Sequence, residues 1–227
     1  MGEINTPGTA KAVGNSRTTI LIIRHGQTQW NVERRIQGHD DSALTAIGIA
    51  QAESLAARLR TDPCAALYSS DLRRALQTAQ IVARQCQAPL HTAPELRERN
   101  HGIFQGLTFA EAQEKYPAEY ARYMDGGPDY VIPSGESKRQ FQERAWAWFL
   151  ACAQRHRGQT VAVVTHGGVL KAMVRAVLNV PLAGHCSIRL YNGSINRFAV
   201  DERGWTIETL GDTAHLRDIT AFTDVFQ

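Results

Sequence analysis

The chain has 227 residues and a net charge of +3, with 43% hydrophobic and 21% charged residues. This composition is that of an ordinary globular domain, large enough to bury a core without disulfides. The weak positive charge gives no reason to expect a nucleic-acid partner, and no apolar run approaches the ~18 residues of a membrane span. The four cysteines form no CxxC pair and the first residues lack an apolar signal segment, so we expect a cytoplasmic protein with reduced cysteines.

The first part of the chain contains one clear strand signal. Residues 1–18 are rich in Gly, Thr, Asn and Ala without periodicity, and we expect them to form a flexible leader. The apolar run 20–23 predicts a strand that is buried on both faces, and the polar residues Arg24, His25 and Gly26 follow it directly. The further elements expected before residue 100 are a loop over 26–44, a helix after the N-cap Thr45, a strand over 66–69 and a helix over 72–85.

Residues 103–134 interrupt the alternation of strands and helices. They contain a short helix near 108–116, a Gly-Gly-Pro turn at 126–128 and six of the thirteen Phe and Tyr residues of the chain. We expect an insertion that covers the sheet, in which the aromatic side chains either anchor the insertion to the core or face a substrate. A long helix follows from Glu136, and its apolar face packs either internally or against a second copy of the chain in a homodimer.

The run 160–164 predicts a second buried strand, and Thr165, His166, Gly167 and Gly168 follow it. The alternation of strands and helices predicts an α/β fold with a mainly parallel central sheet. The remaining expected elements are a helix to about 178, strands at 187–190, 195–200 and 205–210, and a C-terminal tail at 220–227.

Two histidines stand at the carboxyl ends of buried strands, and glycine follows each of them. His25 comes after the first strand and His166 after the strand at 160–164. Open α/β sheets carry their chemistry at this end of the strands, and glycine lets a ligand approach the backbone closely. A structural role is the simpler interpretation for most of the eight histidines, but these two positions favour a functional one.

Arginines and a carboxylate accompany the histidines. Arg24 precedes His25, and Arg73 and Arg74 open the helix after the second strand, from which an arginine can reach back over the sheet edge. An arginine pair also fits a solvated helical face. Histidines with Glu98 could hold a metal ion, but Arg24 disfavours a cation and favours an anion such as phosphate.

This set of residue types suits phosphoryl transfer without a metal. A neutral imidazole beside an arginine-bound phosphate can attack phosphorus and form a phosphohistidine. A nearby carboxylic acid can protonate the leaving alkoxide and then activate water, and the second histidine, if protonated, adds a cationic donor.

Around these residues the chain carries an ordered series of short motifs: LIIRHGQTQWN at 21–31, QG at 37–38, DSALT at 41–45, SSDLRRA at 69–75, TA at 78–79, Glu98 with Gly102, GES at 135–137, THGG at 165–168 and DTAHL at 212–216. The series resembles the motifs of the histidine phosphatase superfamily, the phosphoglycerate-mutase-like enzymes. The resemblance covers residues 19–216, within a catalytic domain that we expect to span 19–219. It implies a three-layer α/β/α sandwich with a helical insertion, or lid, over the active site at about 103–134.

The resemblance also implies roles for individual residues. His25 is expected to be the phosphorylated nucleophile and Glu98 the proton donor and acceptor, with no cofactor and no metal. Ala43, His101 and Gln105 depart from the family pattern, and the last two leave the substrate preference open. The residues expected to bind phosphate are Arg24, Arg74, His166, Asn31, Thr28, Gln37, Gly38 and Gly167.

Three functions fit the resemblance. A phosphatase acting on a small phosphorylated metabolite is favoured over a cofactor-dependent phosphoglycerate mutase, because residues 107–133 contain two basic and five acidic side chains and offer little to a second phosphate. A non-catalytic phosphate-binding module would have lost a key residue. All five central residues, Arg24, His25, Arg74, Glu98 and His166, are in place.

Overall fold

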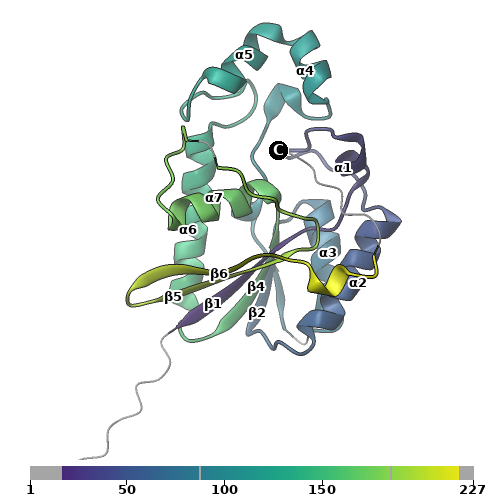
Figure 1. The fold of residues 1–227 in the computed structure, drawn as a ribbon, viewed down its shortest axis with the longest axis vertical. Coiled ribbons are helices and arrows are strands. Elements are labelled where there is room, and N and C mark those ends of the chain that lie inside the picture. Colours follow the sequence, from purple (N-terminus) through teal and green to yellow (C-terminus); the bar gives the residue numbers. More distant parts are fainter. Residues whose placement is uncertain (1–16, 87, 185, 220–227) are drawn as a thin grey trace, which may run out of the picture.

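A six-stranded mixed sheet forms the centre of the molecule (Figure 1). The computed structural model describes residues 17–86, 88–184 and 186–219. The strand order is β3-β2-β4-β1-β5-β6. The first four strands in this order are parallel, and β5 and β6 are antiparallel to their neighbours. The strands are β1 (Thr18–Arg24), β2 (Ala66–Ser69), β3 (Leu90–Thr92), β4 (Thr160–Thr165), β5 (Ile195–Asp201) and β6 (Gly204–Asp212).

The central strand β1 is buried on both faces, as its continuous apolar run predicts. Ile20 and Ile22 face one apolar cluster, and Leu21 and Ile23 face the other, because successive side chains of a strand point to opposite sides. Each of these four side chains is at most 1% exposed.

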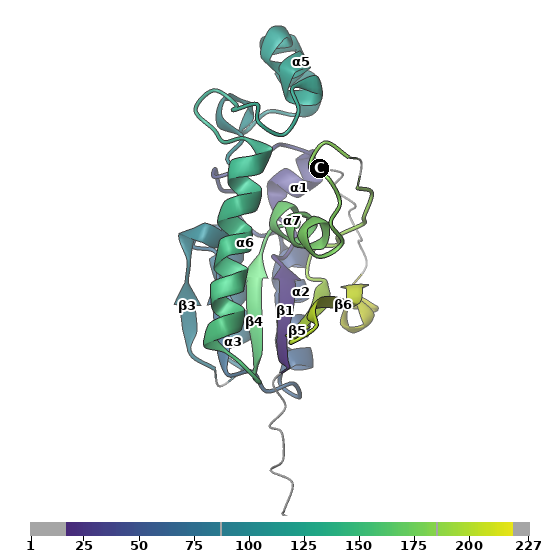
Figure 2. The ribbon, with the colours of Figure 1, turned by 90° about the vertical axis from the view of Figure 1, so that its left-hand side faces the viewer.

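Helices cover both faces of the sheet and confirm the three-layer sandwich (Figure 2). On the face of Leu21 lie α2 (Ala46–Leu59) and α3 (Arg73–Ala83), and on the face of Ile20 lie α6 (Lys138–Arg155) and α7 (Gly167–Val177). Thr45 caps α2 as expected, since its hydroxyl accepts a hydrogen bond from the backbone of Gly48. In the part of the chain that the structure describes, no helix is long and apolar enough to cross a membrane.

The insertion lies beyond the carboxyl ends of the parallel strands (Figure 1). It contains a 3-10 turn (Gly102–Phe104), α4 (Phe109–Lys115) and α5 (Pro117–Asp125). Phe104 is fully buried at its centre, with the rings of Tyr116, Tyr120 and Tyr123 within 6.4 Å of its own. Most of the aromatic side chains therefore anchor the lid, which has its own small core.

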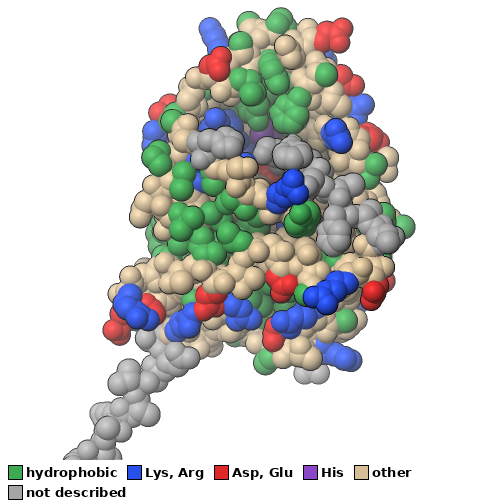
Figure 3. Space-filling model, viewed as in Figure 1, with side chains coloured by type: hydrophobic (Ala, Val, Ile, Leu, Met, Phe, Trp, Pro, Cys, Tyr) green, Lys and Arg blue, Asp and Glu red, His purple; other side chains and the backbone are tan. Residues whose placement is uncertain are grey.

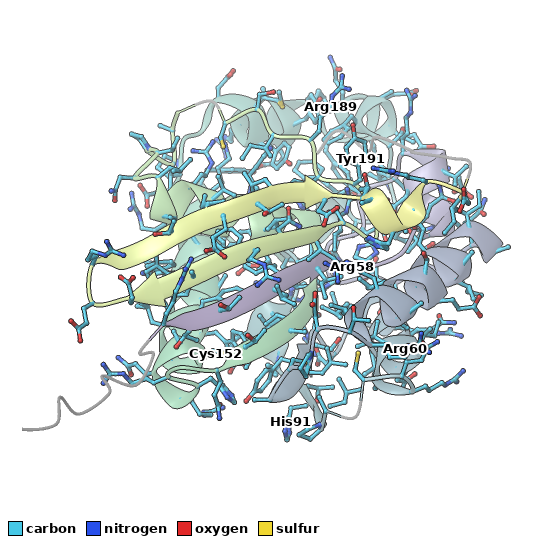
Figure 4. The ribbon with its side chains drawn as sticks, turned by 60° about the horizontal axis from the view of Figure 1, so that its bottom comes forward. Arg58, Arg60, His91, Cys152, Arg189 and Tyr191 are labelled. Carbon is cyan, nitrogen blue, oxygen red and sulfur yellow. The ribbon has the colours of Figure 1, made fainter. Side chains whose placement is uncertain are left out.

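The predicted strand at 187–190 is wrong, because these residues form a loop. Ile188 and Leu190 are partly buried against the cluster beneath α6 and α7, so the alternating pattern reflects a loop that packs its apolar side chains inward. The expected loop 26–44 contains a short helix, α1 (Gln29–Glu33), that sequence reasoning missed together with the edge strand β3. His91 lies on the edge strand β3, and Arg189 and Tyr191 lie toward the opposite edge of the sheet (Figure 4).

Two further expectations concern the ends of the chain. Of the expected leader, residues 1–16 lie outside the described residues, and Thr18 already belongs to β1. The expected tail at 220–227 also lies outside them. The long helix expected from Glu136 begins at Lys138, with Ser137 as its N-cap.

Candidate active site

The two histidines that end buried strands lie side by side. Strands β1 and β4 are parallel neighbours in which Arg24 pairs with Thr165, so the next residues, His25 and His166, leave the sheet together. Their ring centroids are 5.2 Å apart, and the rings meet edge to face. Both side chains are at most 3% exposed.

The hydrogen bonding of His25 fixes which ring nitrogen is reactive. Nδ1 lies 2.7 Å from the carbonyl oxygen of Gly26, and since a carbonyl only accepts, the proton must be on Nδ1. Burial lowers the pKa of His25 well below its usual value, and the charges of Arg74 and Arg24 lower it further. The ring is therefore neutral at neutral pH, with the lone pair on Nε2.

His166 is held by the end of the second strand. Its Nε2 lies 2.8 Å from the hydroxyl of Ser70, and its buried Nδ1 has no hydrogen-bond partner among the described residues. Burial lowers the pKa of His166 well below its usual value, followed by the charges of Arg74, His25 and Arg24. The second histidine is thus neutral in the free protein, and a bound anion would oppose this shift.

Arg74, in the first turn of α3, is almost completely buried, at 1% exposure. Its Nη1 donates to Oδ1 of Asp41 at 2.9 Å and its Nη2 donates to the carbonyl of Gly38 at 2.7 Å. The carboxylate of Asp41 also accepts from the backbone N–H of Arg73, so it joins the helix start to the guanidinium. The Nε of Arg74 has no partner among the described residues. Sequence reasoning missed this role of Asp41, although it lies in a quoted motif.

The loop that carries Gln37 and Gly38 closes over Arg74. Gly38 has a φ of +55°, which favours glycine, and a Cβ there would lie 2.2 Å from Oε1 of Gln105, so any other residue would also displace the Gln105 side chain. The same oxygen of Gln105 accepts from the backbone of His39 at 2.7 Å. Gln37 is buried, and its Oε1 has no partner in the described part of the chain. Gln105 therefore supports the loop.

Asn31 is buried in α1 with its amide oriented by two neighbours. Its Oδ1 accepts from the backbone N–H of Thr28 at 3.1 Å and from the Asn192 side chain at 3.2 Å, which leaves Nδ2 as a donor with no partner among the described residues. The hydroxyl of Thr28 accepts from the backbone of Asn31 and caps the helix. Asn192 also donates to the carbonyl of His25. No motif in the sequence pointed to Asn192.

Arg24 completes the basic side of the site. It is 4% exposed, and its Nη1 donates to the carbonyl of Leu190 in the loop before β5. Gly167 lies near it, since a Cβ added at Gly167 would be 3.4 Å from the Arg24 Nε. The structure thus brings these two residues close together.

Glu98 is buried, at 3% exposure, between two backbone donors. Its Oε1 accepts from the N–H of Arg99 at 2.8 Å, and its Oε2 accepts from the N–H of Gly168 at 2.9 Å. Gly168 lies in the first turn of α7, where a Cβ would be only 1.9 Å from Oε1. The glycine that follows Gly167 therefore allows the carboxylate to rest against the helix.

A cavity of about 510 Å³ opens beside Glu98, between the lid, α6 and α7. Tyr123 and His101 line it, so one of the lid aromatics does face a space that a ligand could enter. Burial, followed by the charge of Arg99, lowers the pKa of His101 to about 3. Basic and histidine side chains are visible in the recess below the lid in Figure 3.

The arrangement provides buried hydrogen-bond donors that no other described residue satisfies. They are Nε of Arg74, Nδ1 of His166 in its donor tautomer and Nδ2 of Asn31. A buried unsatisfied polar group costs roughly 1–3 kcal/mol, so such a cluster favours an acceptor-rich ligand. Between residues 17 and 219, as far as the chain is described, no three His, Cys, Asp or Glu side chains are grouped to hold a metal ion.

The chain resembles known proteins over most of its length. The model of a family described as the histidine phosphatase superfamily (branch 1) matches residues 20–213. A Proteus mirabilis protein named "Probable phosphoglycerate mutase GpmB" is 38% identical over 205 residues, which cover 88% of this chain and 95% of that protein. The "Metal-independent phosphoserine phosphatase" of Arabidopsis thaliana is also 38% identical over 205 residues, covering 89% of this chain and 84% of that protein.

Among solved structures, YhfR of Bacillus stearothermophilus superposes with a TM-score of 0.82 at 36% sequence identity. The match covers 88% of this chain and the whole of that one. The two chains therefore share one fold over most of their length.

Proposed function

Because the chain belongs to the histidine phosphatase superfamily, we propose that it hydrolyses a small phosphomonoester through a phosphohistidine on His25. One observation carries the proposal. The hydrogen bond from Nδ1 of His25 to the carbonyl of Gly26 leaves the Nε2 lone pair of this neutral, buried ring free, in a site whose buried donors have no partner among the described residues. The Arabidopsis relative named as a metal-independent phosphatase supports the same chemistry without a metal.

The first step forms the phosphoenzyme. The Nε2 lone pair of His25 attacks phosphorus, the bond between phosphorus and the ester oxygen breaks, and protonated Glu98 gives its proton to the leaving oxygen. Arg24, Arg74 and Asn31 hold the phosphoryl oxygens and neutralise their charge. His166 donates from Nδ1 and adds a positive charge if the dianion raises its proton affinity.

The second step releases phosphate. The Glu98 carboxylate takes a proton from water, the oxygen of that water attacks phosphorus, and the bond from Nε2 of His25 to phosphorus breaks. Inorganic phosphate leaves, and Glu98 is protonated again for the next cycle. Glu98 accepts hydrogen bonds from two backbone N–H groups, and these bonds keep its oxygens at one position through both steps.

A mutase remains a second candidate because of the cavity beside Glu98. Its lining includes the basic residues Arg99, Lys138, Lys171 and Arg175, which the charge count over 107–133 did not include. The cations come from the helices of the sandwich and the Glu98 loop, and they could hold a second anionic group. The Proteus mirabilis relative carries the name of a mutase.

The experiment is phosphate release from p-nitrophenyl phosphate by the wild type and by His25→Ala, with enzyme from the radiolabelled ester quenched in alkali, where phosphohistidine is stable. We expect release by the wild type, a loss of more than roughly 10³-fold in the variant, and an acid-labile label on His25 alone. Equal rates in the two proteins would overturn the proposal. Faster conversion of 3-phosphoglycerate to 2-phosphoglycerate than release of phosphate would select the mutase.

A further inference from the structure

The short turn that precedes β5 is hydrogen-bonded to the end of β1. The N–H of Gly193 donates to the carbonyl oxygens of Arg24 at 3.0 Å and of His25 at 3.3 Å. The carbonyl of Ser194 accepts from the N–H of Arg24 at 3.3 Å. The turn therefore holds the backbone of the nucleophile of the proposed reaction and of the arginine before it.

Asn192 is the residue of this turn whose side chain contacts two residues of the site. It is 3% exposed, and its Nδ2 donates to the carbonyl oxygen of His25 at 2.9 Å and to Oδ1 of Asn31 at 3.2 Å. Both partners are acceptors, since Oδ1 of Asn31 also accepts from the backbone N–H of Thr28. This fixes the amide orientation of Asn192, because only its NH2 group has two hydrogens to donate.

The bond to His25 acts on the peptide group that follows the nucleophile. The N–H of the same peptide group, which belongs to Gly26, donates to the hydroxyl of Thr78 at 3.1 Å. Asn192 and Thr78 thus hold this peptide group from its two ends. The carbonyl of Gly26, next along the chain, orients Nδ1 of His25 and with it the attacking Nε2. A shift of the peptide group would therefore turn the imidazole away from phosphorus.

The bond to Asn31 acts on a donor for the phosphoryl oxygens. Asn192 and the N–H of Thr28 both donate to Oδ1 of Asn31, and Nδ2 of Asn31 has no partner within the described ranges. A rotation of the Asn31 amide by half a turn would place its NH2 group against these two donors, which is unfavourable. Asn192 therefore keeps the NH2 group of Asn31 available to a ligand.

A role in the turn alone explains Asn192 less well. An asparagine that stabilises its own turn accepts, through its side-chain oxygen, from the backbone N–H two residues on. Here that N–H belongs to Ser194 and donates to the carbonyl of Tyr191 instead. Oδ1 of Asn192 is buried and has no partner in the part of the chain that the structure describes, which is unfavourable for stability. The side chain gives both of its hydrogens to the site.

The DTAHL motif at 212–216, to which the proposed reaction assigns no role, fixes the same turn. Nε2 of His215 lies 3.0 Å from the carbonyl of Gly193, and the ring must be the donor because a carbonyl only accepts. Tyr191, one residue before Asn192, lies near this C-terminal segment in Figure 4. A turn held in this way keeps the two partners of Asn192 in one relative position.

We propose that Asn192 is a positioning residue of the phosphoryl-transfer site, which keeps Nε2 of His25 and Nδ2 of Asn31 directed at the same phosphoryl group. This proposal rests on the proposed function, because it takes His25 as the nucleophile and Asn31 as a ligand of the phosphoryl oxygens. Asn192 acts through these two residues and does not itself touch the substrate.

The experiment is a double-mutant cycle of Asn192→Ala and Asn31→Ala, with kcat/KM measured for p-nitrophenyl phosphate. Asn192→Ala should lower kcat/KM by at least about 10-fold, since a small misplacement of a reacting group can cost roughly 10²-fold. In the Asn31→Ala background the same substitution should cost at least about 3-fold less, because one of its two partners is then missing. An equal loss in both backgrounds would overturn the proposal.

Inhibition by inorganic phosphate reports the binding half of the role. Asn192→Ala should raise the Ki of phosphate by about 3-fold or more, the effect of losing one oriented hydrogen bond. An unchanged Ki would overturn the link to Asn31. Asn192→Leu has a similar branched shape without hydrogen-bond donors, and the same results are expected from it if Asn192→Ala does not fold.

Asn196→Ala is the matched control, because Asn196 is also a fully buried asparagine. Its Nδ2 donates to the carbonyl of Ile22, and none of its described hydrogen bonds reaches His25 or Asn31. Its kcat/KM and phosphate Ki should stay within about 3-fold of the wild type at a temperature where circular dichroism shows all proteins folded. Losses in Asn196→Ala equal to those in Asn192→Ala would overturn the positioning role. A wild type that releases no phosphate would instead refute the proposed function.

Discussion

Replacing Gly168 by alanine tests how finely the position of Glu98 is set. The new Cβ would lie 1.9 Å from Oε1 of Glu98, whereas ordinary contact begins at 3.4 Å, so the carboxylate must move by about 1.5 Å. Gly168 has a helical backbone without positive φ, and alanine there favours the helix by about 1 kcal/mol. The substitution therefore displaces the acid without weakening α7.

A misplacement of about 1 Å at a reacting group can cost roughly 10²-fold in rate. We expect Gly168→Ala to lower kcat/KM for an alkyl phosphate by at least about 100-fold. p-Nitrophenyl phosphate should lose much less in kcat/KM, because its leaving group needs little protonation. The measurement is kcat/KM for both esters, since this ratio reports the phosphorylation of His25 and not the later hydrolysis of the phosphoenzyme, with thermal unfolding as the check that the fold is intact.

Gly167→Ala is the neighbouring control. Its Cβ would lie 3.4 Å from the Nε of Arg24, which is ordinary contact, so the loss should be less than about 10-fold and similar for both esters. Equal losses on the alkyl and nitrophenyl esters in Gly168→Ala would show that its Cβ disturbs phosphate binding. Full activity on the alkyl ester would show that Glu98 is not the proton donor.

Three other predictions concern charge. Asp41→Ala should lower the free energy of unfolding by roughly 2–3 kcal/mol, because it leaves the buried Arg74 without its carboxylate partner. The measurement is urea unfolding, in which added inorganic phosphate should restore part of the lost stability. Stability should also fall on acidification, because His101 has a pKa of about 3 when folded and its usual value of 6.5 when unfolded, so the unfolded chain binds more protons between these values. Between pH 7 and pH 5 this titration of His101 lowers the free energy of unfolding by about 2 kcal/mol. Over the same range the free energy of unfolding of His101→Gln should therefore fall by about 2 kcal/mol less than that of the wild type. Finally, EDTA should leave phosphate release unchanged, and a loss restored by added metal would contradict the metal-free mechanism.

The sequence sufficed to predict the histidine pair because its signal is local. A continuous apolar run predicts a doubly buried strand, and parallel strands present their carboxyl ends at one edge. His25 and His166 follow two such runs and lie 5.2 Å apart. The residue pattern also pointed to Arg73, Arg74 and Glu98, and the family resemblance then gave Arg74 and Glu98 their expected roles. The structure holds these two side chains buried beside the strand ends.

The remaining features depend on tertiary packing that leaves no local pattern. β3 has three residues, and two of them are exposed, so it lacks an alternating signal. The loop at 187–190 alternates because it lies on an apolar cluster, which is the same pattern that a strand would give. Lys138 and Lys171 look like ordinary charges on two helices until the packing of α6 against α7 brings them to one cavity.

The connections of β1 and β4 explain why Arg74 and the cations of the cavity beside Glu98 occupy different parts of the site. After β1 the chain passes to the layer of α2 and α3, and after β4 it enters α7 on the opposite face. A crevice opens where neighbouring parallel strands diverge in this way. Arg74 reaches it from α3, whereas Lys138 and Lys171 reach it from α6 and α7. Substitutions on α6 and α7 can therefore reshape the cavity beside Glu98 while Arg74, on the opposite face of the sheet, stays in place.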